Sequence, residues 1–276
     1  MKSSYFMPKD EMKGFVCGLA MNKQEGIFLN GLADPSIKDL LPPPLELADP
    51  LNPLFYLYAV NIKMPSFTPG YQEGGIGVLA KYGDIVGMYF FNVMLCGPGA
   101  LMGAYIGRET SGLPKKLCDA IVIEREGRHA QCHIERKGVR LLDVEMEVGS
   151  YNFPEFKMEQ EESASMPEGL LTGGGCLLHR YTLDEGTGAR DMELINYDSP
   201  TRYYSWEPAS ATVKLSSSID DPYGEVPLTT VLGAAWARCD NWIAGNTVIH
   251  RYPDEEAADI MQYLFAGRYD QGVIVK

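Results

Sequence analysis

Short apolar runs alternate with turn residues along most of this chain. Glycines and prolines mark the turns and often come in pairs, as in Pro69-Gly70 and Gly74-Gly75. Runs rich in β-branched and aromatic residues, bounded in this way, are typical of β-strands. Such runs occupy residues 55–60, 88–93, 120–125, 129–136 and 139–148. The pattern predicts a mainly β fold, in which short antiparallel strands form a curled or closed barrel with a few flanking helices.

Two segments carry the start and stop signals of helices. Residues 34–41 begin with Asp34 and Pro35, which are favoured at the N-cap and in the first turn. Residues 253–265 begin with a proline and acidic residues and are followed by Gly267, a residue type that often ends a helix. The apolar face of this second segment consists of Ala257, Ile260, Met261 and Leu264.

The remaining segments do not divide the chain into parts. Residues 227–237 fit either a helix or a pair of strands. Residues 157–167 hold three glutamates and few apolar residues, which indicates a solvated connection between elements of one core. We therefore expect residues 1–276 to form one domain.

Composition excludes several classes of function. The formal net charge of −13 argues against a nucleic-acid partner and against anionic membrane surfaces, because both need a basic footprint. No run of apolar residues is long enough for a transmembrane helix, and the first residues lack the apolar core of a signal peptide. The six cysteines are dispersed, as expected of buried thiols in a reducing compartment. We expect a cytoplasmic protein.

The strongest candidate for chemistry is the adjacent pair Lys115 and Lys116, which ends the decamer that begins at Gly107. Apolar residues precede and follow this decamer, at 100–106 and 117–123. A lysine in apolar surroundings favours the neutral amine, and a second ammonium beside it acts in the same direction. A neutral amine is the form that attacks a carbonyl carbon, so the pattern indicates an amine nucleophile.

The decamer Gly-Arg-Glu-x-x-x-x-Pro-Lys-Lys resembles the active-site signature of the acetoacetate decarboxylase family. Weaker matches follow in the expected order: the Pro-x-Pro-Leu-Glu element at 42–46, the Tyr-x-Glu at 71–73 and the Glu-Leu-Ile-Asn at 193–196. The resemblance implies a mainly antiparallel β barrel of the acetoacetate decarboxylase type with a few helices, often assembled into a large homo-oligomer.

The same resemblance implies roles for three residues. Lys115 would form a protonated Schiff base with a ketone, and this cation would accept the electrons of the bond that breaks next to it. Lys116 would supply positive charge near Lys115 or help to hold an anionic keto acid, unless it faces the surface. Glu73 would transfer protons or orient the substrate. Because the imine is itself the electron sink, no metal, nucleotide or pyridoxal cofactor is implied.

Two positions depart from the family's pattern. The decarboxylases carry a second pocket glutamate about fifteen residues before the first, whereas this chain has Tyr58 there. They also carry an arginine near the start of the chain, where this sequence offers Lys23 and has no arginine before Arg108. These two departures argue against acetoacetate as the substrate, but they do not affect the expected Schiff base on Lys115.

Three functions therefore stay open. The first is a lysine-dependent lyase that decarboxylates a β-keto acid such as acetoacetate. The second is an aldolase-dehydratase that acts on pyruvate and an aldehyde through the same imine. The third is a small-molecule binding protein that keeps Lys115 without turnover. Substitution of Lys115 separates the two enzymes from the binding protein, because only an enzyme would lose its chemistry.

Overall fold

The computed structural model describes residues 4–12, 18–153, 169–186 and 188–273. Within these ranges the chain is mainly β, and its strands join in one large sheet. The strands are β1 (Ala20–Ala33), β2 (Glu46–Leu47), β3 (Leu54–Pro65), β4 (Tyr71–Tyr82), β5 (Ile85–Cys96), β6 (Lys115–Leu117), β7 (Ala120–Glu126), β8 (His129–Arg136), β9 (Val139–Val148), β10 (Leu170–Thr172), β11 (Gly175–Asp184), β12 (Gly188–Asp198), β13 (Thr201–Leu215), β14 (Leu228–Trp242) and β15 (Gly245–Arg251).

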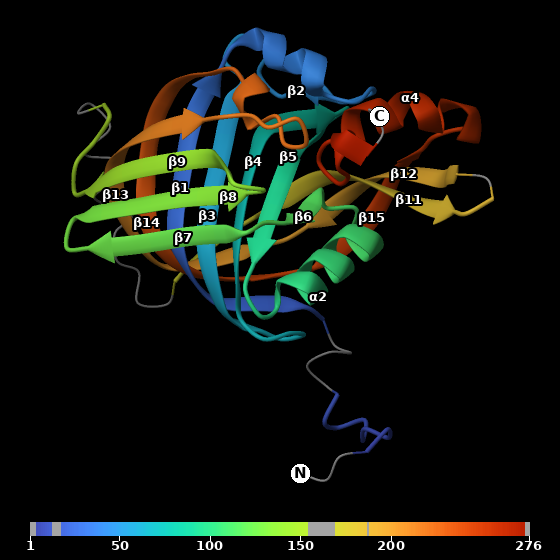
Figure 1. Cartoon of the computed structure of the whole chain (residues 1–276), viewed down its shortest axis with the longest axis horizontal. Coiled ribbons are helices and arrows are strands. Elements are labelled where there is room, and N and C mark those ends of the chain that lie inside the picture. The colour runs from blue at the N-terminus through green and yellow to red at the C-terminus, as the bar shows by residue number, and fades with distance from the viewer. Residues whose placement is uncertain (1–3, 13–17, 154–168, 187, 274–276) are drawn as a thin grey trace.

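The sheet curls around a core without closing on itself in the described part of the chain (Figure 1). Its strand order runs β15-β12-β11-β5-β4-β3-β1-β14-β13-β9-β8-β7, with β2, β6 and β10 paired at the sides. Almost all pairs are antiparallel, while β5 pairs in parallel with both β6 and β11. The mainly β class and the curled sheet predicted from the sequence are confirmed.

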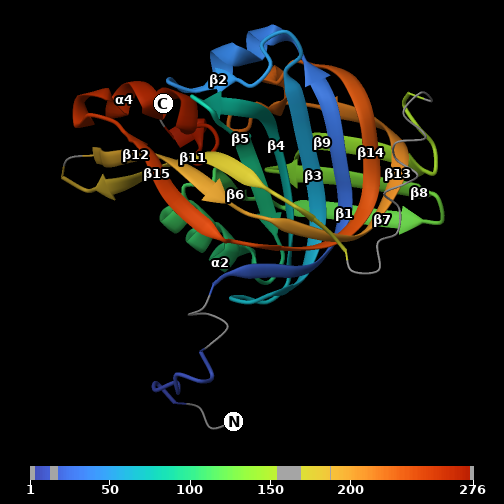
Figure 2. The ribbon, with the colours of Figure 1, turned by 180° about the vertical axis from the view of Figure 1, so that it is seen from behind.

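The main apolar core lies against one face of the long strands, because these strands place apolar side chains there in alternation. Figure 2 shows β1, β3 and β4 side by side, with the hairpins β7 to β9 crossing behind them. Phe55 and Leu57 of β3 and Ile134 and Leu142 from the β8–β9 hairpin are fully buried. Side chains from both parts of the sheet therefore share one apolar cluster.

Helices are few and short. The predicted helix near residue 34 is the 3-10 helix η1 (Pro35–Leu40), and the Asp34 carboxylate accepts a hydrogen bond from the backbone N–H of Ser36. The predicted C-terminal helix is also present, and it buries Ala257, Ile260 and Leu264. This C-terminal helix consists of η5 (Asp254–Glu256) and α4 (Ala257–Leu264), and the other helical elements are α2 (Ala100–Tyr105), η2 (Ile106–Thr110), η4 (Tyr223–Glu225) and η6 (Gln271–Val273).

Residues 228–237 of the undecided segment 227–237 belong to strand β14, which pairs with β1 on one side and β13 on the other. The expected solvated connection at 157–167 lies outside the described residues. Among the helices that the structure describes, none is long and apolar enough to cross a membrane.

Candidate active site

Lys115 enters the interior of the curled sheet from the short strand β6. This strand pairs in parallel with β5, so that Val93 lies opposite Lys115. The side chain of Lys115 is 7% exposed, and its Nζ lies 2.7 Å from Oε2 of Glu73 on strand β4. The structure therefore brings together two of the three residues predicted from the sequence, although 42 positions separate them in the chain.

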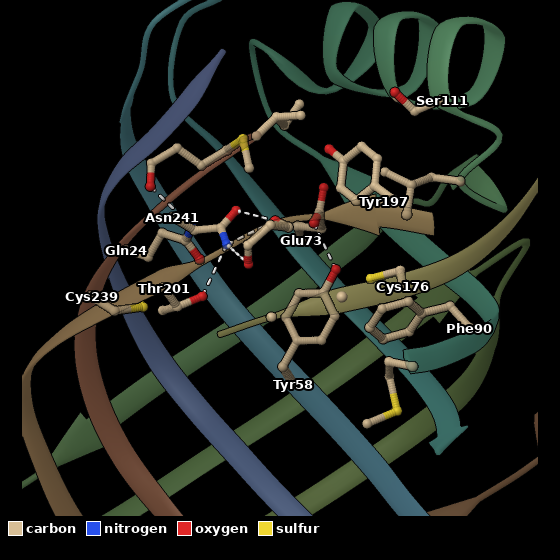
Figure 3. Close-up of a pocket in the computed structure, with 18 of the residues that line it drawn as sticks. Gln24, Tyr58, Glu73, Phe90, Ser111, Cys176, Tyr197, Thr201, Cys239 and Asn241 are labelled. Atoms are coloured by element: carbon tan, nitrogen blue, oxygen red, sulfur yellow. Dashed lines mark hydrogen bonds between the residues drawn. The ribbon is translucent and has the colours of Figure 1, made fainter. Parts of the chain in front are cut away.

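Glu73 has a second partner that the sequence did not reveal. The hydroxyl of Tyr58, on strand β3, donates a hydrogen bond of 2.7 Å to Oε1 of Glu73 (Figure 3). Tyr58 pairs with Gly75 across the β3–β4 ladder, and a Cβ on Gly75 would lie 2.9 Å from the ring of Tyr58. A glycine at this position therefore leaves room for the tyrosine ring.

The amine of Lys115 lies directly against the backbone of Gly107. A Cβ at residue 107 would lie 2.8 Å from Cδ and Cε of Lys115 and 3.0 Å from Nζ. These separations are shorter than packed carbon atoms allow, so the glycine of the signature decamer makes space for the lysine side chain. The segment between Gly107 and Lys115 thus contributes both the buried amine of Lys115 and the gap that holds it.

The loop before Lys115 is fixed by Gly112 and Arg268. Gly112 has a φ of +80°, and a Cβ there would lie 2.1 Å from the carbonyl oxygen of His179. The buried guanidinium of Arg268 donates hydrogen bonds of 2.6 Å to the carbonyl oxygens of Gly112 and His179. The loop therefore packs backbone to backbone against β11, an approach that only glycine permits.

Lys115, Glu73 and Tyr58 line a cavity of about 430 Å³. Most of its wall is apolar or aromatic, and Figure 3 shows Phe90, Cys176 and Tyr197 on one side of Glu73 and Gln24, Thr201 and Asn241 on the other. Among the described residues that line it, Lys115 and Glu73 are the only ones with charged side chains. The apolar part of the wall includes Phe28, Tyr56, Ile62, Phe67, Met88, Phe90 and Leu113.

The other titratable groups of this cavity are uncharged near neutral pH. Burial, and then the nearby Glu73 carboxylate, raise the pKa of the Tyr58 hydroxyl well above its usual value. The same two causes raise the pKa of the Cys176 thiol to about 12. Burial also raises the pKa of the Tyr56 and Tyr197 hydroxyls. Tyr58 therefore remains a hydrogen-bond donor to Glu73 at any physiological pH.

Lys116 points away from this cavity, because successive residues of a strand face opposite sides. It is not a surface lysine, since the residue is only 4% exposed. Its Nζ lies 2.6 Å from Oδ1 of Asp221 and 3.3 Å from Oδ1 of Asp270. The ammonium also donates hydrogen bonds to backbone carbonyl oxygens of Asp220, Ala266 and Tyr269, at 2.8, 3.2 and 3.1 Å.

The other residues singled out in the sequence lie outside the cavity. Arg108 forms an ion pair with Glu109 at 2.7 Å and contacts the ring of Tyr269. Lys23 is exposed, and its backbone N–H donates to Asp240. In the described part of the chain, no group of three or more histidine, cysteine, aspartate or glutamate residues is placed to hold a metal ion.

Polar residues at one end of the cavity were missed by sequence reasoning. The side chain of Asn241 donates hydrogen bonds to the hydroxyls of Ser199 and Thr201, both at 3.0 Å. The Gln24 amide donates to the carbonyl oxygen of Met21 at 3.0 Å. These residues come from β1, β13 and β14 and from the turn before β13, and no local motif marks them. Their proximity depends on the pairing of distant strands.

The chain matches known proteins along nearly its whole length. The family model described as "Acetoacetate decarboxylase (ADC)" matches residues 5–253. A protein of Lactiplantibacillus plantarum named "CLA biosynthesis isomerase" is 32% identical over 275 residues, which cover 98% of this chain and 95% of that relative. This relative is named an isomerase, not a decarboxylase.

Solved structures share the fold at low sequence identity. An acetoacetate decarboxylase from Legionella pneumophila has a TM-score of 0.69 at 15% identity, covering 85% of this chain and 88% of that one. The enduracididine biosynthesis enzyme MppR complexed with pyruvate has a TM-score of 0.61 at 12% identity, covering 91% and 95%. The fold, the signature decamer and the matched family model agree: this chain belongs to the acetoacetate decarboxylase family.

Proposed function

We propose that this protein is an isomerase that shifts a carbon–carbon double bond toward the carbonyl group of an apolar ketone, through an imine on Lys115. The observation that carries the proposal is the chain of contacts from Lys115 through Glu73 to Tyr58 in an otherwise uncharged cavity. A carboxylate held between an amine and a phenol is suited to moving protons at carbon, next to the imine.

The first step is imine formation. The neutral amine of Lys115 attacks the ketone carbon, water leaves, and a protonated imine remains. Glu73 is the group in contact with the amine and is therefore the acceptor for the proton that the ammonium must lose. The positive charge of the imine then makes the hydrogens on the neighbouring carbon acidic.

The second step moves the double bond. In a β,γ-unsaturated ketone, Glu73 removes a proton from the carbon between the imine and the double bond, which gives a neutral dienamine. The protonated Glu73 returns the proton to the γ carbon, which gives a conjugated iminium. Hydrolysis releases the α,β-unsaturated ketone and the free amine. Tyr58 holds the Glu73 carboxylate by its hydrogen bond throughout this exchange.

Two features favour isomerisation over decarboxylation. A β-keto acid would bring a second carboxylate next to Glu73, and among the described lining residues Lys115 is the only cation available to hold it. The chain also has Tyr58 where the family's decarboxylases carry their second glutamate, and the relative that is 32% identical is named an isomerase. An apolar cavity of about 430 Å³ suits a ketone with a long hydrocarbon chain.

Decarboxylation of a β-keto acid such as acetoacetate is the second candidate. It is supported by the signature decamer and the family model, and it would use the same imine on Lys115. In this reaction the carboxylate leaves as carbon dioxide, the electrons pass to the imine, and the resulting enamine is protonated and hydrolysed. We propose Lys116 as a positioning residue in either reaction, because its buried contacts hold the strand that presents Lys115.

The test compares three substrates: a long-chain β,γ-unsaturated ketone, acetoacetate and pyruvate. We expect conjugation of the unsaturated ketone, measured by ultraviolet absorbance, and transfer of deuterium to the γ carbon from a substrate that is deuterated at the α carbon. Borohydride should trap an adduct on Lys115. Lys115→Arg should abolish both signals, while Lys81→Arg, a change at a partly exposed lysine, should leave them intact.

Each alternative has its own outcome. Carbon dioxide release from acetoacetate, with no conjugation of the unsaturated ketone, would replace the isomerase by the decarboxylase. An adduct with pyruvate alone would favour the aldolase-dehydratase. Binding without turnover or an adduct would favour the binding protein. Isomerisation that survives in Lys115→Arg would contradict the imine route.

A further inference from the structure

Two cysteines lie opposite each other where strand β6 leaves β5. The parallel register pairs Met94 with Lys116 and Leu95 with Leu117, so the next pair in line is Cys96 with Cys118. The pairing continues past the last residue of β6, since the backbone N–H of Cys118 donates to the carbonyl oxygen of Leu95 at 3.0 Å. Directly opposed residues of neighbouring strands have the Cα spacing that a disulfide requires.

The two thiols have different surroundings. The Cys96 sulfur accepts a hydrogen bond from the backbone N–H of Ile121 at 3.1 Å, and it also lies 3.5 Å from the side-chain oxygen of Gln72. The Cys118 thiol is directed at the carbonyl oxygens of Leu95 and Ala120, at 3.5 and 3.7 Å. A sulfur that accepts hydrogen bonds favours the thiolate, whereas a thiol among carbonyl oxygens favours the protonated form. Both residues are half-buried, whereas Cys132 and Cys239 are buried.

The ionisation of the pair follows the same asymmetry. A hydrogen bond from Cys118 lowers the pKa of Cys96 to about 7, and the Ile121 N–H acts in the same direction. The interaction with Cys96, together with burial, raises the pKa of Cys118. By contrast, burial raises the pKa values of Cys132, Cys176 and Cys239 to about 12. Of the cysteines that the structure describes, Cys96 is thus the one with thiolate character near neutral pH.

We propose that Cys96 and Cys118 form a redox-active dithiol that a hydroperoxide converts to a disulfide between β5 and the strand that carries Lys115. The Cys96 thiolate attacks the peroxide oxygen, the O–O bond breaks, and the leaving oxygen takes up a proton. Cys96 is then a sulfenic acid. The Cys118 sulfur attacks the Cys96 sulfur, the S–O bond breaks, and water leaves with the Cys118 proton.

This reaction is balanced and has a structural consequence. The two thiols lose two electrons, and the hydroperoxide is reduced to an alcohol and water. An added thiol reverses the reaction by exchange. In the described part of the chain β6 pairs with β5 alone, so the disulfide would join Lys115's strand covalently to its one neighbour in the sheet. The site is distinct from the cavity, because neither cysteine lines it.

The test uses the reduced full-length protein, one equivalent of hydrogen peroxide and alkylation of the remaining thiols. Trypsin separates the two cysteines, because it releases Cys96 in peptide 82–108 and Cys118 in peptide 117–125. We expect these two peptides to appear joined, with the loss of two hydrogens, and to separate after reduction. Two unlinked peptides, each alkylated, would overturn the proposal.

Single substitutions assign the two roles. Cys118→Ala should stop the reaction at the sulfenic acid of Cys96, which dimedone traps, whereas Cys96→Ala should leave Cys118 a free thiol. Cys132→Ala, a change at a cysteine buried in β8, should still form the linked peptide. With iodoacetamide at pH 7, Cys96 should react at least about tenfold faster than Cys118. Equal rates, or dimedone on Cys118 in Cys96→Ala, would contradict the assignment.

Discussion

The hydroxyl of Tyr58 donates its hydrogen bond to one carboxylate oxygen of Glu73, while Lys115 contacts the other oxygen. Tyr58 is also the residue found fifteen positions before Glu73, where the family's decarboxylases carry a second glutamate. A carboxylate at that position would face Glu73 and repel it. The phenol instead supports it, so the pocket of this chain holds one carboxylate with two donors.

Tyr58→Phe should therefore separate proton transfer from imine formation. The variant keeps the ring but removes the donor, so Glu73 loses the contact that holds it in place. We expect turnover of the unsaturated ketone to fall about ten- to hundredfold, while borohydride trapping on Lys115 stays within about twofold. Tyr82→Phe, which removes a hydroxyl bonded to His250, is the matched control. An equal loss of trapping would mean that Tyr58 serves the imine step.

Gly107→Ala should displace the amine of Lys115. The new methyl carbon would lie 2.8 Å from Cδ and Cε and 3.0 Å from Nζ of the lysine, which is too close for packed atoms, so the side chain must move. We expect the rate of adduct formation under borohydride to fall at least about tenfold. Gly245→Ala is the control, because the nearest atom to its new methyl group would be 3.5 Å away. Unchanged trapping with a folded protein would contradict the close contact.

Lys116→Met should destabilise the protein. The change leaves the Asp221 carboxylate, whose side chain is fully buried, without one of its cations, although Arg136 still contacts it at 2.8 Å. Breaking a buried ion pair from one side typically lowers the free energy of unfolding by about 3 to 5 kcal/mol. Urea unfolding would measure it, with Lys81→Met as the control. A loss below about 1 kcal/mol would mean that Arg136 alone satisfies Asp221.

His179→Gln should make the free energy of unfolding less dependent on pH below pH 6.5. Burial, and then the positive charge of Arg268, lower the pKa of His179 from 6.5 to about 3. The unfolded chain therefore binds a proton at His179 between these values that the folded protein does not bind. Stability conferred by the neutral ring is complete above pH 6.5 and is lost as pH falls toward 3.

The variant makes this loss measurable. Between pH 6 and pH 4 the free energy of unfolding of the unmodified protein should fall more steeply than that of His179→Gln, by about 1.4 kcal/mol per pH unit. Urea titrations at several pH values would give both slopes. Parallel slopes would show that His179 takes up its proton in the folded protein. In that case Nε2 of His179 would carry a proton and would donate the 3.0 Å hydrogen bond to the Tyr252 hydroxyl.

The sequence predicted those features that depend on local patterns. The meander of β7, β8 and β9 was evident from apolar runs and tight turns, and η1 was evident from Asp34 and Pro35. Helix α2 was not predicted, because it is short and has no side-chain cap. It is held by packing instead, since Gly103 lies against Leu95 and Tyr71.

The candidate site was predictable only where a motif marked it. The decamer pointed to Lys115, and the Tyr-x-Glu element pointed to Glu73. The contribution of Tyr58 depends on the register of β3 against β4, which no local signal gives. The partners of Lys116 lie more than a hundred residues further along the chain, so its burial could not be inferred from a dipeptide.

The opposite orientations of Lys115 and Lys116 connect two parts of the molecule that share no cavity. Of the residues that the structure describes, Ala266 and Tyr269 do not line the cavity of Lys115 and Glu73, yet their carbonyl oxygens accept hydrogen bonds from the ammonium of Lys116. A rotation of β6 about its own axis would break the hydrogen bonds of Lys116 and the contact between Lys115 and Glu73 together. The carbonyl oxygens of Ala266 and Tyr269 therefore help to fix the direction of the Lys115 side chain, although they lie on the opposite side of strand β6.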